Sequence, residues 1–206
     1  PTAEEYGAGL VVETYNAGLA HGFVDHASAR VLPLVDALAE SPADVLCLQE
    51  VWSGADRRTI VSGLKHQFPY SWHTPVEQSF TPGAACGLRE LFGGDKFVSC
   101  LQSECGDTQG DAQTDCVVKQ CGGTLERLKT SNPECATALM AQVGRTAGSA
   151  LWEVIRPWGV VGNFAYEGSN GLMLLSRKPL GSPAVFDLSE LSTLNRRGVL
   201  KASATM

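Results

Sequence analysis

The chain concentrates its cysteines in one stretch, and this cluster limits the possible folds more than any other feature. Six of the seven cysteines belong to it: Cys86, Cys100, Cys105, Cys116, Cys121 and Cys135. An even, dense set in a short glycine-rich segment is typical of a disulfide framework. A zinc site normally shows a C-x2-C pair or interspersed histidines, whereas the tightest spacing here is C-x4-C and no histidine intervenes. We therefore predict three disulfides and leave their pairing open.

The cysteine cluster also predicts where the protein works. Disulfides form and persist in oxidising compartments, so we expect a secreted or extracytoplasmic protein. The chain begins at Pro1 without a charged and then apolar leader, as expected if a signal peptide has been removed. No apolar run approaches the roughly 20 residues of a membrane-spanning helix. A net charge of -6 disfavours a protein that mainly neutralises a nucleic-acid backbone.

Strand-like and helix-like patterns alternate before the cluster. Residues 10–16 (LVVETYN) are β-branched and aromatic, which predicts a buried strand. Residues 27–40 carry apolar side chains at helical spacing, with Pro33 expected in the first turn. Residues 44–51 (DVLCLQEV) form a nearly continuous apolar run, typical of a central strand covered on both faces. The next expected elements are a helix over 56–68 and a strand over 69–73.

Regular strand patterns stop at the cysteine cluster and resume after it. Residues 81–156 contain glycine pairs and only short helix-like pieces, which predicts an inserted, disulfide-stapled subdomain. Residues 1–80 and 157–206 are then parts of one domain, and their mixture of strands and helices predicts a layered α+β fold. Because the last pattern runs into Met206 without a turn, we expect further strands to complete its sheet. The later strands are expected over 171–176, 183–187 and 197–205.

Two polar residues end neighbouring apolar strands. Glu50 follows the run LCLQ, and Asn16 ends the preceding strand in the same manner. A carboxylate in such a position is costly to bury alone, and it is a hard oxygen ligand for Mg²⁺ or Ca²⁺. For Glu50 alone, a side chain turned to solvent is the simpler interpretation. Two polar groups that converge at one sheet edge favour a functional site instead.

Asn170 and Arg197 are further candidates with simpler alternatives. Asn170 lies in a Ser-Asn-Gly sequence that a turn alone would explain. Arg197 follows another arginine and could bind phosphate through its guanidinium group or remain solvated. The histidines are interpreted as surface or loop residues: His21, His26, His66 and His73.

The order of these motifs resembles a known superfamily. ETYNAGL, ADVLCLQEVWS, EGSNGLMLLSRKPL and NRRGVLKA follow one another as in the first half of endonuclease/exonuclease/phosphatase proteins, which include deoxyribonucleases and neutral sphingomyelinases. The resemblance covers about residues 10–80 and 160–205. It is greatest to the sphingomyelinase branch, in EVWS, SNGLMLLSRKPL and RRGVLKA. It implies a four-layer α/β/β/α sandwich of two mixed sheets, of which this chain would supply roughly one half.

The resemblance also implies roles for single residues. Glu50 matches the family's metal-binding glutamate and would hold a catalytic Mg²⁺, or Mn²⁺ or Ca²⁺ in its place. Asn16 matches an asparagine beside the metal and the scissile phosphate, so both are expected to be catalytic and metal-site residues. Asn170 and Arg197 would bind substrate. The family's Asp-x-Asn motif and later catalytic histidines have no match, so we expect residues 1–206 alone to be inactive and a second polypeptide or C-terminal remainder to supply them.

Three functions follow as hypotheses. The motifs and the acidic charge favour a phosphodiesterase acting on a phospholipid headgroup, with peripheral membrane contact. Leu91, Phe92, Trp152 and Trp158 would then face lipid, although packing against the rest of the domain is the favoured interpretation of these side chains. A secreted nuclease would need a basic groove, which this half of the sequence does not display. The presence of both Asn16 and Glu50 argues against a non-catalytic binding protein.

Overall fold

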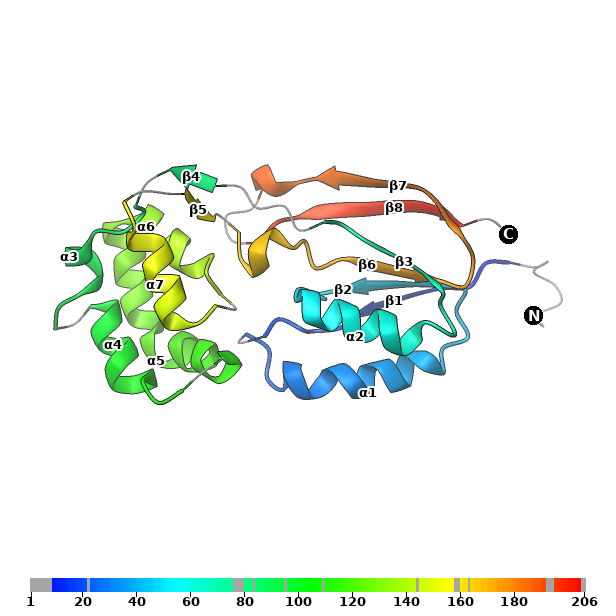
Figure 1. Cartoon of the computed structure of the whole chain (residues 1–206), viewed down its shortest axis with the longest axis horizontal. Coiled ribbons are helices and arrows are strands. Elements are labelled where there is room, and N and C mark those ends of the chain that lie inside the picture. Colours follow the sequence, from blue (N-terminus) through cyan, green and yellow to red (C-terminus); the bar gives the residue numbers. More distant parts are fainter. Residues whose placement is uncertain are drawn as a thin grey trace.

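The chain folds as a mixed α+β structure, which confirms the predicted fold class. The computed structural model describes residues 9–21, 23–75, 80–82, 84–94, 96–108, 110–143, 145–157, 160–162, 164–191 and 195–204. Strands at both ends of the chain form the layered part, and the residues between them form a group of helices (Figure 1).

A four-stranded mixed sheet organises the layered part. β1 and β2 are parallel, whereas β6 pairs antiparallel with both β2 and β3. The order across the sheet is β1-β2-β6-β3. β2 and β6 are therefore central, in agreement with the apolar runs in their sequences. The bounds are Val12–Asn16 for β1, Val45–Gln49 for β2, Tyr70–His73 for β3 and Met173–Ser176 for β6.

Two helices cover one face of this sheet. α1 (Ala27–Ala39) and α2 (Gly54–Leu64) lie side by side below the sheet in Figure 1 and pack on each other. A Cβ at Gly63 of α2 would lie 2.4 Å from Val35 of α1, so the small residue permits the close approach. The core beneath contains Leu46 and Leu48 of β2 together with the buried faces of both helices.

Two local predictions about these elements are wrong. Pro33 lies inside α1, six residues after its first residue Ala27, and not in the first turn. The 10–16 strand forms as β1 but is exposed, with Val12 56% and Tyr15 46% accessible. It is exposed because β1 is an edge strand, paired only with β2 among the described strands. A β-rich pattern predicts a strand but not its place in a sheet.

A hairpin lies on the other side of the sheet. β7 (Leu180–Asp187) and β8 (Gly198–Ala204) pair antiparallel and contact β3 and β6 respectively. Figure 1 shows the hairpin above the sheet and the helices below it, so the described residues provide three successive layers. Short 3-10 helices, η1 (Tyr166–Gly168) and η2 (Ser189–Leu191), precede β6 and β8.

The cysteine-rich residues form a group of helices with its own core. Short strands β4 (Phe80–Pro82) and β5 (Val160–Gly162) pair at the two ends of this segment. Three disulfides, Cys86–Cys135, Cys100–Cys121 and Cys105–Cys116, confirm the predicted framework, and Cys47 stays free. The helices are α3 (Leu88–Leu91), α4 (Phe97–Cys105), α5 (Gly110–Ser131), α6 (Pro133–Met140) and α7 (Ala147–Ile155).

The helical content of this segment exceeds the prediction of short pieces. α5 alone has 22 residues and continues through Gly122 and Gly123. The buried residues of the whole cysteine-rich segment form a hydrophobic cluster that is separate from the cluster under the sheet. The division into a domain of residues 1–80 and 157–206 with an 81–156 insertion stays a prediction. Among the described residues, no helix is long and apolar enough to cross a membrane.

Candidate active site

Asn16 and Glu50 meet at one end of the sheet. β1 and β2 are parallel with Asn16 opposite Gln49, so the residues that end the two strands emerge side by side. Asn16 Nδ2 donates to Glu50 Oε1 at 2.9 Å. In Figure 1, β1 and β2 point toward the helical segment at this end, where β6 and β8 begin. The structure thus brings together the two residues that the sequence predicted as a site.

The loop after β1 fixes the orientation of the Asn16 amide. Ala17 N donates to Gln49 O at 2.9 Å and Leu19 N donates to Glu50 O at 3.1 Å, which ties this loop to the end of β2. Gly18 N donates to Asn16 Oδ1 at 2.9 Å. With its oxygen accepting from Gly18 and its nitrogen donating to the carboxylate, Asn16 is placed to position Glu50.

Glu50 adopts a backbone conformation that is rare for its residue type. Its φ is 58°, in the left-handed region, where a Cβ crowds the following carbonyl. Such a conformation costs on the order of 1 kcal/mol and persists when surrounding contacts determine it. Here, those contacts are the backbone bond from Leu19 N and the side-chain bond from Asn16. The strand therefore ends sharply, and the half-buried carboxylate is held at the rim.

A buried arginine supports the chain beyond Glu50. Arg57 is only 3% accessible, and its Nε donates to Val51 O at 3.0 Å. Its Nη2 donates to the hydroxyl of Ser169, which connects α2 to the loop before β6. Burial lowers the pKa of the Arg57 guanidinium. Sequence analysis missed this residue because its exposed neighbour Arg58 has the same side chain, and only the helix register separates them.

Asn170 and Arg197 lie together on the hairpin side of the same sheet end. Both line a cavity of about 240 Å³, along with Thr74 and Asp187. Asn170 is buried, and its Oδ1 accepts from Leu172 N at 3.1 Å, so part of its role is the turn before β6. Arg197 is exposed, and within the described ranges its side chain makes no hydrogen bond or ion pair, although its backbone carbonyl accepts from Leu188 N at 2.9 Å. It is therefore available to an anion.

The cavity of Asn170 adjoins the end of β2. Val51 N, one residue after Glu50, donates to Gly171 O at 2.9 Å, one residue after Asn170. On the opposite wall, Asp187 accepts from Arg196 Nη2 at 2.9 Å. The side-chain and backbone hydrogen bonds from Ser189, then the contact with Arg196, lower the pKa of the Asp187 carboxyl. Asp187 thus holds one arginine of the pair and leaves the other exposed.

His21 lies in the loop after β1, in agreement with the interpretation of the histidines as surface or loop residues, but its side chain is largely buried. Its side chain is only 14% accessible, and Nε2 lies 2.6 Å from Asp56 Oδ2 in the first turn of α2. Nδ1 lies 3.2 Å from Ser28 Oγ. Both ring nitrogens are therefore engaged, and the histidine joins the loop after β1 to α1 and α2. His26, His66 and His73 are exposed, in agreement with the prediction.

The donor set at Glu50 suits a hard cation that keeps most of its water. No group of three or more His, Cys, Asp or Glu side chains converges within the described part of the chain. Mg²⁺ is commonly held by one or two carboxylates with water and substrate phosphate oxygens completing its octahedron. Glu50 Oε1 accepts from Asn16, whereas Oε2 makes no hydrogen bond with any residue that the structure describes. One carboxylate oxygen at the rim is therefore free for such an ion.

The comparisons with known proteins identify the class. The model of the endonuclease/exonuclease/phosphatase family matches residues 14–205, and the chain belongs to this family. Its members hydrolyse phosphodiesters or phosphate esters and generally use divalent metal ions. No curated protein and no solved structure matches the chain significantly. The family resemblance is confirmed over nearly the whole sequence.

The strain at Glu50 is testable by two substitutions at one position. Glu50→Gly and Glu50→Ala both remove the carboxylate, but only glycine adopts a positive φ without cost. We expect Glu50→Gly to be more stable than Glu50→Ala by about 1 kcal/mol, which shifts the melting temperature by roughly 2–4 °C. At Gln49, a regular strand position, the order should reverse. Calorimetry of the four variants, Gly and Ala at each of the two positions, measures these differences in melting temperature. Equal stability of Glu50→Gly and Glu50→Ala would show that the backbone at Glu50 is not strained.

The support from Arg57 is testable against its neighbour. Arg57→Gln removes charged hydrogen bonds to Val51 and Ser169, so we expect a loss of about 2 kcal/mol and a melting temperature lower by roughly 4–8 °C. Arg58→Gln alters an exposed side chain and should change stability by less than about 0.5 kcal/mol. Similar melting of the two variants would show that Arg57 does not support the loop.

Proposed function

We propose that the protein is a secreted, divalent-metal-dependent phosphodiesterase that cleaves a phospholipid headgroup, as sphingomyelinases and phospholipases C do. The observation that carries this proposal is the Asn16–Glu50 pair at the rim of the sheet, 2.9 Å apart, in a chain of the endonuclease/exonuclease/phosphatase family. Three disulfides support export, because such bonds persist in oxidising compartments.

Each predicted residue has a distinct task in this proposal. Glu50 would hold the ion, with Mg²⁺ favoured over Mn²⁺ or Ca²⁺. Asn16 would keep the Glu50 carboxylate directed at the ion through their hydrogen bond. A bound divalent ion neutralises charge on phosphoryl oxygens and lowers the pKa of its water. Arg197 would bind a phosphate oxygen by charge-assisted hydrogen bonds, and the amide of Asn170 would line the substrate side of the site.

In this proposal, the remaining catalytic groups, which are the acid-base residues, come from outside residues 1–206. The sequence of the chain contains no Asp-x-Asn motif, and both ring nitrogens of His21 are engaged. The exposed edge of β1 and the exposed apolar side chains Phe186 and Val199 of the hairpin offer surfaces for further strands. A second polypeptide or a C-terminal remainder is the proposed source of those strands and of the acid-base residues.

A lipid substrate is favoured over nucleic acid by the surface of the chain. The net charge is -6, and a phosphate backbone would need a basic footprint. Phe92 and Trp152 of the helical segment are 46% and 54% accessible, and they support the proposed peripheral contact with a membrane. Leu91 is buried and packs inside the segment instead, whereas Trp158 lies outside the described residues.

The test compares two substrates in a native preparation and in residues 1–206 alone. We expect the native preparation to release phosphocholine from sphingomyelin without nicking plasmid DNA, and EDTA to abolish the release. Glu50→Gln keeps an acceptor for Asn16 but removes the charge, so it should lower kcat on the order of 10²-fold or more. Glu40→Gln, an exposed carboxylate at the end of α1, is the matched control and should be fully active.

The outcomes separate the parts of the proposal. Residues 1–206 alone should give no turnover in either assay. Full activity from a preparation containing only the 21.9 kDa chain would refute the need for further residues. Metal-dependent nicking of DNA without phosphocholine release would instead establish a nuclease. Activity that survives both EDTA and Glu50→Gln would refute the metal site.

A further inference from the structure

The first turn of α2 holds both loops that follow the two strands of the candidate site. Its consecutive residues Asp56 and Arg57 are 7% and 3% accessible. Arg57 Nε donates to Val51 O at 3.0 Å, in the loop after β2. Asp56 Oδ2 lies 2.6 Å from His21 Nε2, in the loop after β1. One buried turn of one helix therefore determines the positions of both loops.

Backbone hydrogen bonds connect His21 to the candidate site. His21 N donates to Leu19 O at 3.1 Å, and Leu19 N donates to Glu50 O at 3.1 Å. Gly18 N, in the same loop, donates to the side-chain oxygen of Asn16 at 2.9 Å. A displacement of His21 therefore disturbs the two amides, those of Gly18 and Leu19, that hold the Asn16–Glu50 pair.

The backbone of His21 has a separate support on the side of η1. Tyr166 OH donates to His21 O at 3.0 Å, and the Tyr166 ring stacks on Trp52 with their centroids 5.4 Å apart. Because this bond is made to a backbone carbonyl, any side-chain variant at position 21 retains it. Substitution of His21 therefore tests the imidazole contacts alone.

The two ring nitrogens of His21 have contacts of unequal strength. A carboxylate only accepts hydrogen bonds, so Nε2 carries the proton that Asp56 binds. Nδ1 lies 3.2 Å from the hydroxyl of Ser28, an exposed residue in the first turn of α1. The side chains of the His21–Asp56 contact are only 14% and 10% accessible. Hydrogen bonds to charged groups are about twice as strong as neutral ones, so the Nε2 contact is the stronger.

We propose that His21 is a positioning residue for the Asn16–Glu50 pair and acts through Asp56. The imidazole holds the loop after β1 against α2, and the loop backbone then fixes the Asn16 amide and the carbonyl of Glu50. The effect of His21 on turnover rests on the proposed function, whereas its effect on the order of the loop does not.

Two amide substitutions separate the contacts of the imidazole. The side-chain nitrogen of glutamine takes nearly the place of Nε2, and that of asparagine nearly the place of Nδ1. His21→Gln therefore keeps a donor for Asp56, whereas His21→Asn loses it. His26→Asn is the matched control, because His26 is exposed and its φ of 62° suits asparagine.

The first measurement is hydrogen exchange of backbone amides, followed by NMR on the purified protein. We expect His21→Asn to accelerate exchange at Gly18 and Leu19 about tenfold. His21→Gln should accelerate it less than about threefold, and His26→Asn should leave it unchanged. The amides of the central strand β2 should keep their rates, because only the loop opens.

The exchange rates can contradict the proposal in two ways. Equal acceleration in the loop and in β2 would show a general loss of stability, and equal rates in the two His21 variants would remove the role of Nε2. If His21→Asn fails to fold, Asp56→Asn replaces it and should accelerate the same two loop amides. Ser28→Ala removes only the partner of Nδ1 and should not accelerate them.

The second measurement is steady-state kinetics on the substrate of the proposed function. His21→Asn should lower kcat about tenfold and change KM less than about twofold, because the loop of Asn16 is displaced and not the substrate. His21→Gln should recover most of the loss. A raised KM with unchanged kcat would overturn the positioning role. If the unsubstituted protein shows no turnover, the proposed function fails, and the exchange rates still decide the role of His21.

Discussion

The parallel pairing of β1 with β2 is the constraint on which the candidate site depends. Parallel strands end at the same sheet edge, and with Asn16 opposite Gln49 the next residue along β2 lies within hydrogen-bond reach. An antiparallel pairing would put the two ends at opposite edges. The parallel connection in turn requires a crossover, which α1 supplies while burying the helix-facing side of β2. Core packing and site geometry are therefore set by the same connection.

Around this pair, the structure uses buried polar groups to hold an irregular backbone. Glu50 takes a left-handed φ, and the next residue, Val51, bonds across to Gly171. Arg57 then donates a hydrogen bond to the carbonyl of Val51. This interaction requires that the guanidinium group be removed from water, which is unfavourable. Because the described residues give Arg57 no carboxylate partner, its buried charge is a costly support for the loop. Its presence behind the predicted metal ligand indicates that the position of this loop matters.

The sequence predicts the residues of the candidate site, but it does not predict the buried residues that hold the site in place, and the reasons are physical. Asn16 and Glu50 can be paired because strand order and direction follow from apolar runs and the intervening helix pattern. Arg57 cannot be told from Arg58 by composition, because helix register relative to the sheet decides which one is buried. The exposure of β1 is likewise set by its neighbours in the sheet, which a strand pattern does not contain. The pairing of six cysteines depends on helix packing, so the sequence predicts three disulfides but not their partners.

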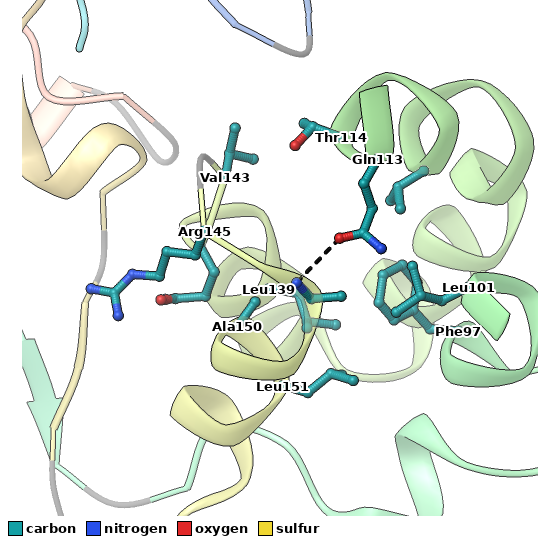
Figure 2. Close-up of a pocket in the computed structure, with 12 residues that line it drawn as sticks. Phe97, Leu101, Gln113, Thr114, Leu139, Val143, Arg145, Ala150 and Leu151 are labelled. Atoms are coloured by element: carbon teal, nitrogen blue, oxygen red, sulfur yellow. Dashed lines mark hydrogen bonds between the residues drawn. The ribbon is translucent and has the colours of Figure 1, made fainter. Parts of the chain in front are cut away.

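The disulfides also bear on an apolar cavity between α4, α5 and α7 (Figure 2). The space of about 80 Å³ between these helices is open to solvent, so the apolar side chains that line it are only partly removed from water. The segment around it has a small core of its own, and small cores provide little stability. Closing the 49-residue separation between Cys86 and Cys135 contributes about 4 kcal/mol through the unfolded chain. The cross-links therefore stabilise a segment whose helices do not pack closely around this space.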